Sequence, residues 1–566
     1  MTTEGNTTDQ PAHSAERASG VPPAQRDATT RYLCAAAHLD PVFGDAAIAE
    51  FLVEPYRAIP PAPGVDAAAV LRDAVAARAR RRIRDGVLLL LLVFLAFVSL
   101  PALVVWLIIA LASSSVAKTS IRRGRDAVST LVAVGVIVLG IVVLPQLVGP
   151  ELTAFLPDIW GVLPAVVLGL LALTVIGIDE LAVHHLVHTS FRPHRFRPDG
   201  GHTDGWEHIL RTLGHPAFQG PLARVAATGE PGHRNLDQAD VVVHRGFSPF
   251  IGAGEQLHRE IITLPLEPAE EDGRHGTGTR SQPRWISVME LQRHVATAIG
   301  ELRSPSSLGP GHRLEGITQH EQVLMAADRL VTNLDTQPQP AVLPALDHAP
   351  AAHIPAADAH DLADTPPEWA RYYQCFRIEA WDRDLATSCY LHIGTDQRML
   401  FLEWTFCVLL PIRKSYREID RFQHPVWIPL SRSLAELATL PATAIRRLRS
   451  VFHQFTPLPQ QDGEVVPAKY GADKSLRELA AASDVQNYFQ GVDVERYVKI
   501  VDAVVFRAVG RYLEDRGYSV VEFMKLADRT VNNLTISGGT FLGSAVGFGN
   551  TAQGNQNKSE PPKGRP

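Results

Sequence analysis

Glu180, His184 and His188 are the residues whose types and spacing best match a chemical site. If the apolar helix that precedes them continues, they lie at positions i, i+4 and i+8 on one helical face. Carboxylate and imidazole groups suit a divalent metal such as Zn²⁺, and i, i+4 spacing suits two ligands. The full H-E-x-x-H arrangement is absent, however, and histidines and acids are common where a helix leaves a bilayer. The pattern leaves two interpretations, a zinc site and a solvated helix end, and favours the second.

Two other motifs give weaker signals. Gly252-Ala-Gly254 follows a strand-like run, but a dinucleotide loop needs a third glycine where Leu257 stands, so a turn is favoured. Asp382 and Asp384 resemble a D-x-D metal site, yet they fall where a β-hairpin needs turn residues. The sequence contains no P-loop lysine, no G-x-S-x-G elbow and no serine, histidine and aspartate series in a recognisable context. The catalytic residues are therefore unknown, and no cofactor is expected, with zinc at Glu180, His184 and His188 as the alternative.

Three apolar stretches must position these residues, and they decide the class of protein. They comprise residues 87–112, 127–148 and 159–178, and none of them contains a charged residue. The last two are about 20 residues long, enough at ~1.5 Å per residue to cross a hydrocarbon core of ~30 Å. A helix of this length without a polar face is rare in a soluble domain. We therefore expect membrane insertion, with the lipid bilayer as a partner.

The distribution of Arg and Lys predicts the topology. Basic residues precede the first stretch, lie between the first and second and follow the third, whereas the loop between the second and third carries only Glu151 and Asp158. Positive flanks stay in the cytoplasm, so we expect a multi-pass protein of the cell membrane with both terminal regions cytoplasmic. Because both flanks of the first stretch are basic, we interpret it as a hairpin that bends at Pro101. A single kinked spanning helix is the alternative.

Composition and periodicity divide the rest of the chain. The runs YYQCFRIEAW, LATSCYLHIG and MLFLEWTFCVLL follow each other closely and predict an antiparallel meander. Further along, apolar residues from Val494 to Leu513 lie on one helical stripe, with Asp493 as the expected N-cap and Gly517 as the C-terminal cap. The expected units are a disordered leader (1–28), a cytoplasmic helical region (29–85), the membrane region (86–190), a cytoplasmic α+β domain with Pro/Gly-rich insertions (200–430), a helical unit (431–531) and a Gly/Asn-rich tail (532–566).

The expected fold class is therefore membrane α-helical, an apolar hairpin plus two transmembrane helices, with a cytoplasmic α+β domain and a C-terminal helical unit. The formal net charge is −6 without a global basic excess, so no nucleic acid is expected as a partner. Four cysteines without a C-x-x-C pair predict buried thiols rather than disulfides or a thiolate zinc site. Residues 532–557 carry no charge and repeat Gly and Asn, so self-assembly through the tail is an alternative to a solvated end.

Several segments together resemble a family of multi-pass membrane proteins of high-GC bacteria. They are EPYRAI, RRRIRD, VVVHRGFSPFIGAGE, LFLEWTFCVLLPIRKSY, SLRELA and YFQGVDVERYVKIV. The resemblance supports the architecture and implies no activity. We expect a membrane-anchored cytoplasmic interaction or signalling protein that binds a protein partner. The alternative is a membrane-associated enzyme that uses the face from Glu180 to His188 or a pocket in the cytoplasmic domain.

Overall fold

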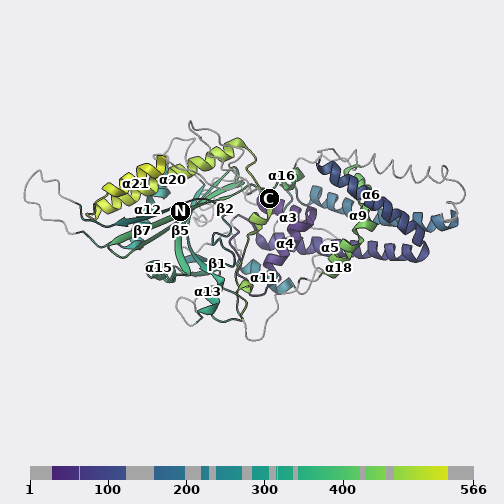
Figure 1. The fold of residues 1–566 in the computed structure, drawn as a ribbon, viewed down its shortest axis with the longest axis horizontal. Coiled ribbons are helices and arrows are strands. Elements are labelled where there is room, and N and C mark those ends of the chain that lie inside the picture. The colour runs from purple at the N-terminus through teal and green to yellow at the C-terminus, as the bar shows by residue number, and fades with distance from the viewer. Residues whose placement is uncertain are drawn as a thin grey trace, which may run out of the picture.

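An α+β body and a helical arm make up the computed structural model (Figure 1). The body contains one sheet with helices packed on it, and the arm projects from one end of the body. The residues that the structure describes are 28–62, 64–122, 159–197, 218–228, 237–269, 283–304, 314, 316–334, 342–420, 427–453, 455 and 465–532.

The helices fall into two groups. The arm and the region where it joins the body contain α3 (Ala28–Leu39), α4 (Pro41–Phe51), α5 (Ala67–Val98), α6 (Leu100–Arg122), α9 (Ile159–Thr189), α11 (Gln219–Thr228), α16 (Lys414–Arg417), α17 (Trp427–Thr439) and α18 (Ala444–Phe452). The body contains α12 (Val288–Gly300), α13 (Ala327–Thr332), α15 (Ala356–Asp364), α19 (Leu476–Ala480), α20 (Tyr488–Asp515) and α21 (Val521–Asn532).

A seven-stranded mixed sheet forms the centre of the body, in the order β2-β7-β6-β5-β3-β1-β4. Its strands are β1 (Gln238–His244), β2 (Glu255–Pro265), β3 (Ile317–Ala326), β4 (His353–Pro355), β5 (Ala370–Ala380), β6 (Leu385–Thr395) and β7 (Met399–Leu409). Strands β5, β6 and β7 form the antiparallel meander expected from the sequence. Among the strands that the structure describes, only β1 and β3 pair in parallel, and β2 is an edge strand that pairs with β7.

Helix α20 packs its apolar stripe directly on the sheet. Asn487 caps its first turn through a capping box with Gln490, so the N-cap lies six residues before the expected one at Asp493. The stripe from Val494 to Leu513 is buried, and the rings of Trp404 on β7 and Phe506 on α20 meet edge to face at 5.1 Å. The helix and the sheet therefore share one core, and the expected separate C-terminal helical unit is wrong.

The first apolar stretch is divided between two helices of the arm. Helix α5 ends at Val98, Ser99 leaves the helical conformation, and α6 begins at Leu100. Pro101 lies in the first turn of α6, where its missing N–H loses no helical hydrogen bond. The chain therefore bends at Ser99, and α5 begins at Ala67, about 20 residues before the apolar stretch.

The expected multi-pass membrane fold class is also wrong. Among the described residues, one helical segment, Pro164–Thr189, is long and apolar enough to cross a membrane. Residues 127–148, the second expected span, lie outside the described residues, as do the leader 1–27 and the tail from 533 onward. The class that the structure supports is α+β, with a mixed seven-stranded sheet and packed helices.

The arginines that suggested a cytoplasmic flank have another role in the structure. Arg80 and Arg84 on α5 form ion pairs with Asp179 on α9, at 3.0 and 2.9 Å. Arg82 and Arg78 donate to the backbone carbonyls of Val451 and His453 at the end of α18. These side chains connect packed helices, because their partners are a carboxylate on another helix and the carbonyl groups at the C-terminal end of α18. The topology expected from the positions of these arginines stays a prediction.

Candidate functional site

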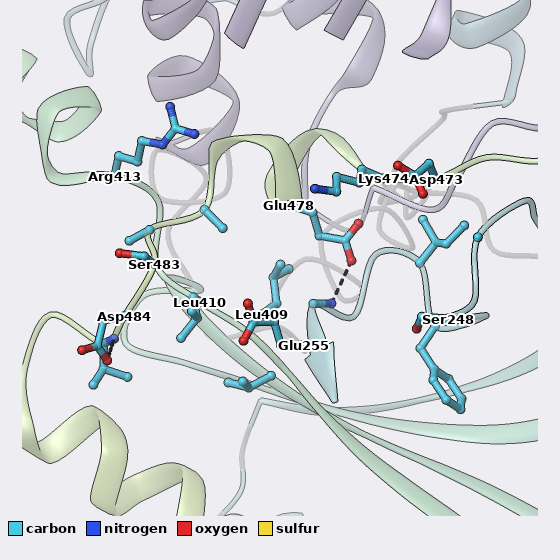
Figure 2. Close-up of a pocket in the computed structure, with 18 of the residues that line it drawn as sticks. Ser248, Glu255, Leu409, Leu410, Arg413, Asp473, Lys474, Glu478, Ser483 and Asp484 are labelled. Carbon is cyan, nitrogen blue, oxygen red and sulfur yellow. Dashed lines mark hydrogen bonds between the residues drawn. The ribbon is translucent and has the colours of Figure 1, made fainter. Parts of the chain in front are cut away.

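A cavity lies at the edge of the sheet, where the body meets the N-terminal helices. Its volume is about 790 Å³, and its walls come from the loop 246–251, the ends of β2 and β7, and residues 473–486. Ser248 and Asp484 stand on opposite sides, and Glu478 points between them toward the start of β2 (Figure 2). Elements far apart in sequence thus converge on one polar opening.

A glycine turn and the carboxylate of Glu478 build the centre of this cavity. Gly252 and Gly254 have φ values of +89° and +85°, a conformation that favours glycine. Their N–H groups donate to Oε1 of Glu478 at 2.8 and 2.9 Å, and the N–H of Ser475 donates to Oε2 at 2.7 Å. The carboxylate is thereby used to hold three backbone groups. It has a structural role and is not free to act as a general base.

The charged groups that face the cavity without a protein partner carry both signs. Lys414 and Lys474 make no ion pair or hydrogen bond with other described residues, and their side chains are exposed, as is that of Glu255. Phe247 at the rim is fully exposed. No histidine or cysteine is among the described residues that line the cavity. The arrangement offers charges and an aromatic anchor for binding.

The candidate metal ligands from the sequence lie elsewhere. Glu180, His184 and His188 occupy one face of α9 and line a separate cavity of about 390 Å³ beside α16 and α17. The rings of the two histidines lie with their centroids 4.2 Å apart. The described residues contain no group of three or more His, Cys, Asp or Glu side chains that could hold a metal ion. Zinc binding by these residues stays a prediction, and metal analysis of the purified protein would test it.

Asp502 is a buried acid that the sequence pattern did not single out. It lies on α20 with no exposed surface, and the indole N–H of Trp404 donates to its Oδ1 at 2.8 Å. Its other oxygen, Oδ2, has no hydrogen-bond partner. Burial raises the pKa of the Asp502 carboxyl to about 7. The signal was an aspartate inside an apolar helical stripe, but which neighbours surround it depends on the packing of α20 on the sheet.

Comparison with known proteins adds one finding. No curated protein and no solved structure matches the chain. A family model described as "AbeC-like domain" matches residues 261–546. The match begins within β2 and includes the rest of the sheet apart from β1, together with α12 to α21. Since it covers half of the 566 residues, the chain belongs to the AbeC-like domain family.

Proposed function

We propose that this chain is a membrane-anchored binding protein, whose arm contacts a lipid bilayer and whose body recruits a protein partner at the cavity beside Glu478. The observation that carries the proposal is the apolar surface of the arm. Leu90 and Phe97 on α5 are 70% and 86% exposed, and Ile108 on α6 is 62% exposed. Leu170 and Ile178 continue this surface on α9, at 58% and 64%.

An exposed apolar band of this kind needs a covering. Soluble proteins rarely leave large contiguous apolar patches in water, because each Å² of apolar surface costs about 25 cal/mol when it stays exposed. The band spans three helices that lie side by side in the arm (Figure 1), and the charged residues of α5 lie toward the body. Lipid hydrocarbon suits such a surface, because it supplies apolar contact without specific shape.

Binding is favoured over catalysis because the central carboxylate of the cavity is occupied by backbone N–H groups. The carboxylate of Glu478 lies at the centre of the cavity, and its two oxygens already accept three backbone N–H groups. Other charged residues line the cavity, and among them Lys414, Lys474 and Glu255 have exposed side chains suited to pairing with groups of opposite sign on a partner. Phe247 supplies an apolar contact beside them.

Vesicle flotation tests the anchor. We expect the full chain to float with vesicles of phosphatidylcholine and phosphatidylglycerol, and the double variant Phe97→Asp, Ile108→Asp to lose at least about tenfold in bound fraction. The reason is that a carboxylate at the centre of a bilayer costs about 2.5–3.5 kcal/mol. Phe247→Asp is the matched control, since Phe247 is at least as exposed but lies in the body, and it should float like the parent chain. Recovery of the parent chain in the bottom fraction would refute the anchor.

A further inference from the structure

The turn between β5 and β6 has an unusual backbone. Three consecutive residues, Trp381, Asp382 and Arg383, have φ values of 56°, 55° and 66°. This left-handed region is rarely adopted by residues with side chains, and a run of three persists only where the surroundings hold it. Here the indole N–H of Trp381 donates to Asp493 on α20 at 2.9 Å. Arg477 on α19 donates to the carbonyl oxygens of Arg383 and Asp384.

Four arginines from four elements meet around this turn, and we call them the arginine cluster. They are Arg377 on β5, Arg383 in the turn, Arg417 on α16 and Arg477 on α19. Two carboxylates oppose them. Glu379 pairs with Nε of Arg383 at 2.7 Å and with Nε of Arg377 at 3.3 Å, and Asp384 pairs with Arg417. Asp382, the other acid of the turn, is exposed.

The four arginines outnumber the two carboxylates that are paired with them, and the inner members of the cluster are buried. Arg377 and Arg477 are 5% and 3% exposed. Buried nitrogens without a hydrogen-bond partner remain on both, Nη2 of Arg377 and Nε of Arg477, and also on Arg417. Removing a charged group from water is costly unless an opposite charge replaces the water.

Loss of a proton does not relieve this imbalance. Burial, with repulsion from Arg377, lowers the pKa of Arg477 to about 9, so the side chain is still protonated at neutral pH. A guanidinium group presents its N–H groups in a planar fork that matches two oxygens of a phosphate or carboxylate. The unused N–H groups of the cluster are therefore complementary to an oxyanion.

We propose that the arginine cluster is a binding site for a phosphate group. Arg377 and Arg477 are its buried members, and Arg383 and Arg417, whose side chains are 35% and 31% exposed, are its members in contact with solvent. A bound phosphate neutralises the excess charge and ties the β5–β6 turn to α16 and α19. All four arginines lie within the matched region 261–546. The proposal is independent of partner binding at the cavity beside Glu478.

Thermal unfolding of the full chain in detergent tests this site, with inorganic phosphate as the probe and chloride at equal ionic strength as the reference. We expect saturating phosphate to raise the Tm of the parent chain by about 5 °C, the shift for a ligand at about 100 times its Kd. Arg477→Met should reduce the shift to below about 1 °C. Arg511→Met is the matched control, an exposed arginine on α20, and should keep the full shift. It also accounts for the general stabilisation that phosphate gives by exclusion from protein surfaces.

Two further comparisons complete the experiment. If Arg477→Met does not fold, Arg417→Gln, at the exposed side of the cluster, should weaken phosphate binding at least about tenfold. Glycerol phosphate and a short-chain phosphatidylglycerol separate the two sources of the phosphate. A larger shift with the lipid assigns the site to a headgroup, and equal shifts assign it to a soluble phosphate compound. Equal phosphate shifts in Arg477→Met and Arg511→Met, or no shift in the parent chain, would overturn the proposal.

Discussion

Gly254→Ala is expected to destabilise the body by more than about 4 kcal/mol, enough to unfold it or prevent its isolation. A Cβ atom at this position would lie 2.1 Å from the carbonyl oxygen of Val408 and 2.7 Å from Cα of Leu409. Both atoms belong to the backbone of β7, which is paired on both sides and cannot move away. The φ of +85° adds about 1–2 kcal/mol for a residue with a side chain. Any movement of the turn away from β7 would also separate the N–H of residue 254 from Glu478.

Urea unfolding followed by tryptophan fluorescence measures this effect. Gly491→Ala is the matched control, because Gly491 lies within α20 and an added Cβ there meets nothing within 4 Å. Alanine in a helix is favoured over glycine by about 1 kcal/mol, so this variant should be slightly more stable than the parent chain. A Gly254→Ala protein with an unchanged midpoint would show that the turn is not packed against β7 as described.

Asp502→Asn is expected to stabilise the protein at pH 8 by about 3 kcal/mol and to leave it nearly unchanged at pH 4. The carboxyl has a pKa of about 7 in the folded chain and 3.8 as the reference value for the unfolded chain. Between these values the folded state binds more protons than the unfolded state, so stability falls as pH rises from about 4 to about 7. The full difference corresponds to about 4 kcal/mol. The amide keeps an oxygen that accepts from the N–H of Trp404. Burying its NH₂ group costs about 1 kcal/mol, which reduces the stabilisation by that amount.

The free energy of unfolding, measured at several values between pH 4 and pH 8, provides the test. The parent chain should lose stability across this range at Asp502, and Asp502→Asn should show a correspondingly flatter profile. Asp328→Asn serves as the control, since the Asp328 side chain is 66% exposed and its removal should not alter the slope. Parallel pH profiles for the parent chain and Asp502→Asn would contradict a raised pKa at this carboxyl.

Local sequence patterns determined much of the secondary structure of the body. The meander β5-β6-β7 and the buried stripe of α20 follow from the periods with which apolar residues repeat along a strand and a helix. The four cysteines are free and buried, as their apolar surroundings predicted. These properties depend on neighbours within one element, so the sequence contains the information needed to predict them.

Which element a charged or apolar side chain meets was decided by the tertiary structure alone. The arginines of α5 indicated a membrane flank, but Arg84 pairs with Asp179, 95 residues further along the chain. Glu478 completes a local capping box with Ser475, and its second oxygen accepts from a turn more than 220 residues earlier. The cavity, the arginine cluster and the partner of Asp502 combine residues from separate elements in the same way. The period of apolar residues along the sequence shows which side of an element is buried. The partner of a charged group depends on the distance between the two groups, and that distance is set only when the elements pack together.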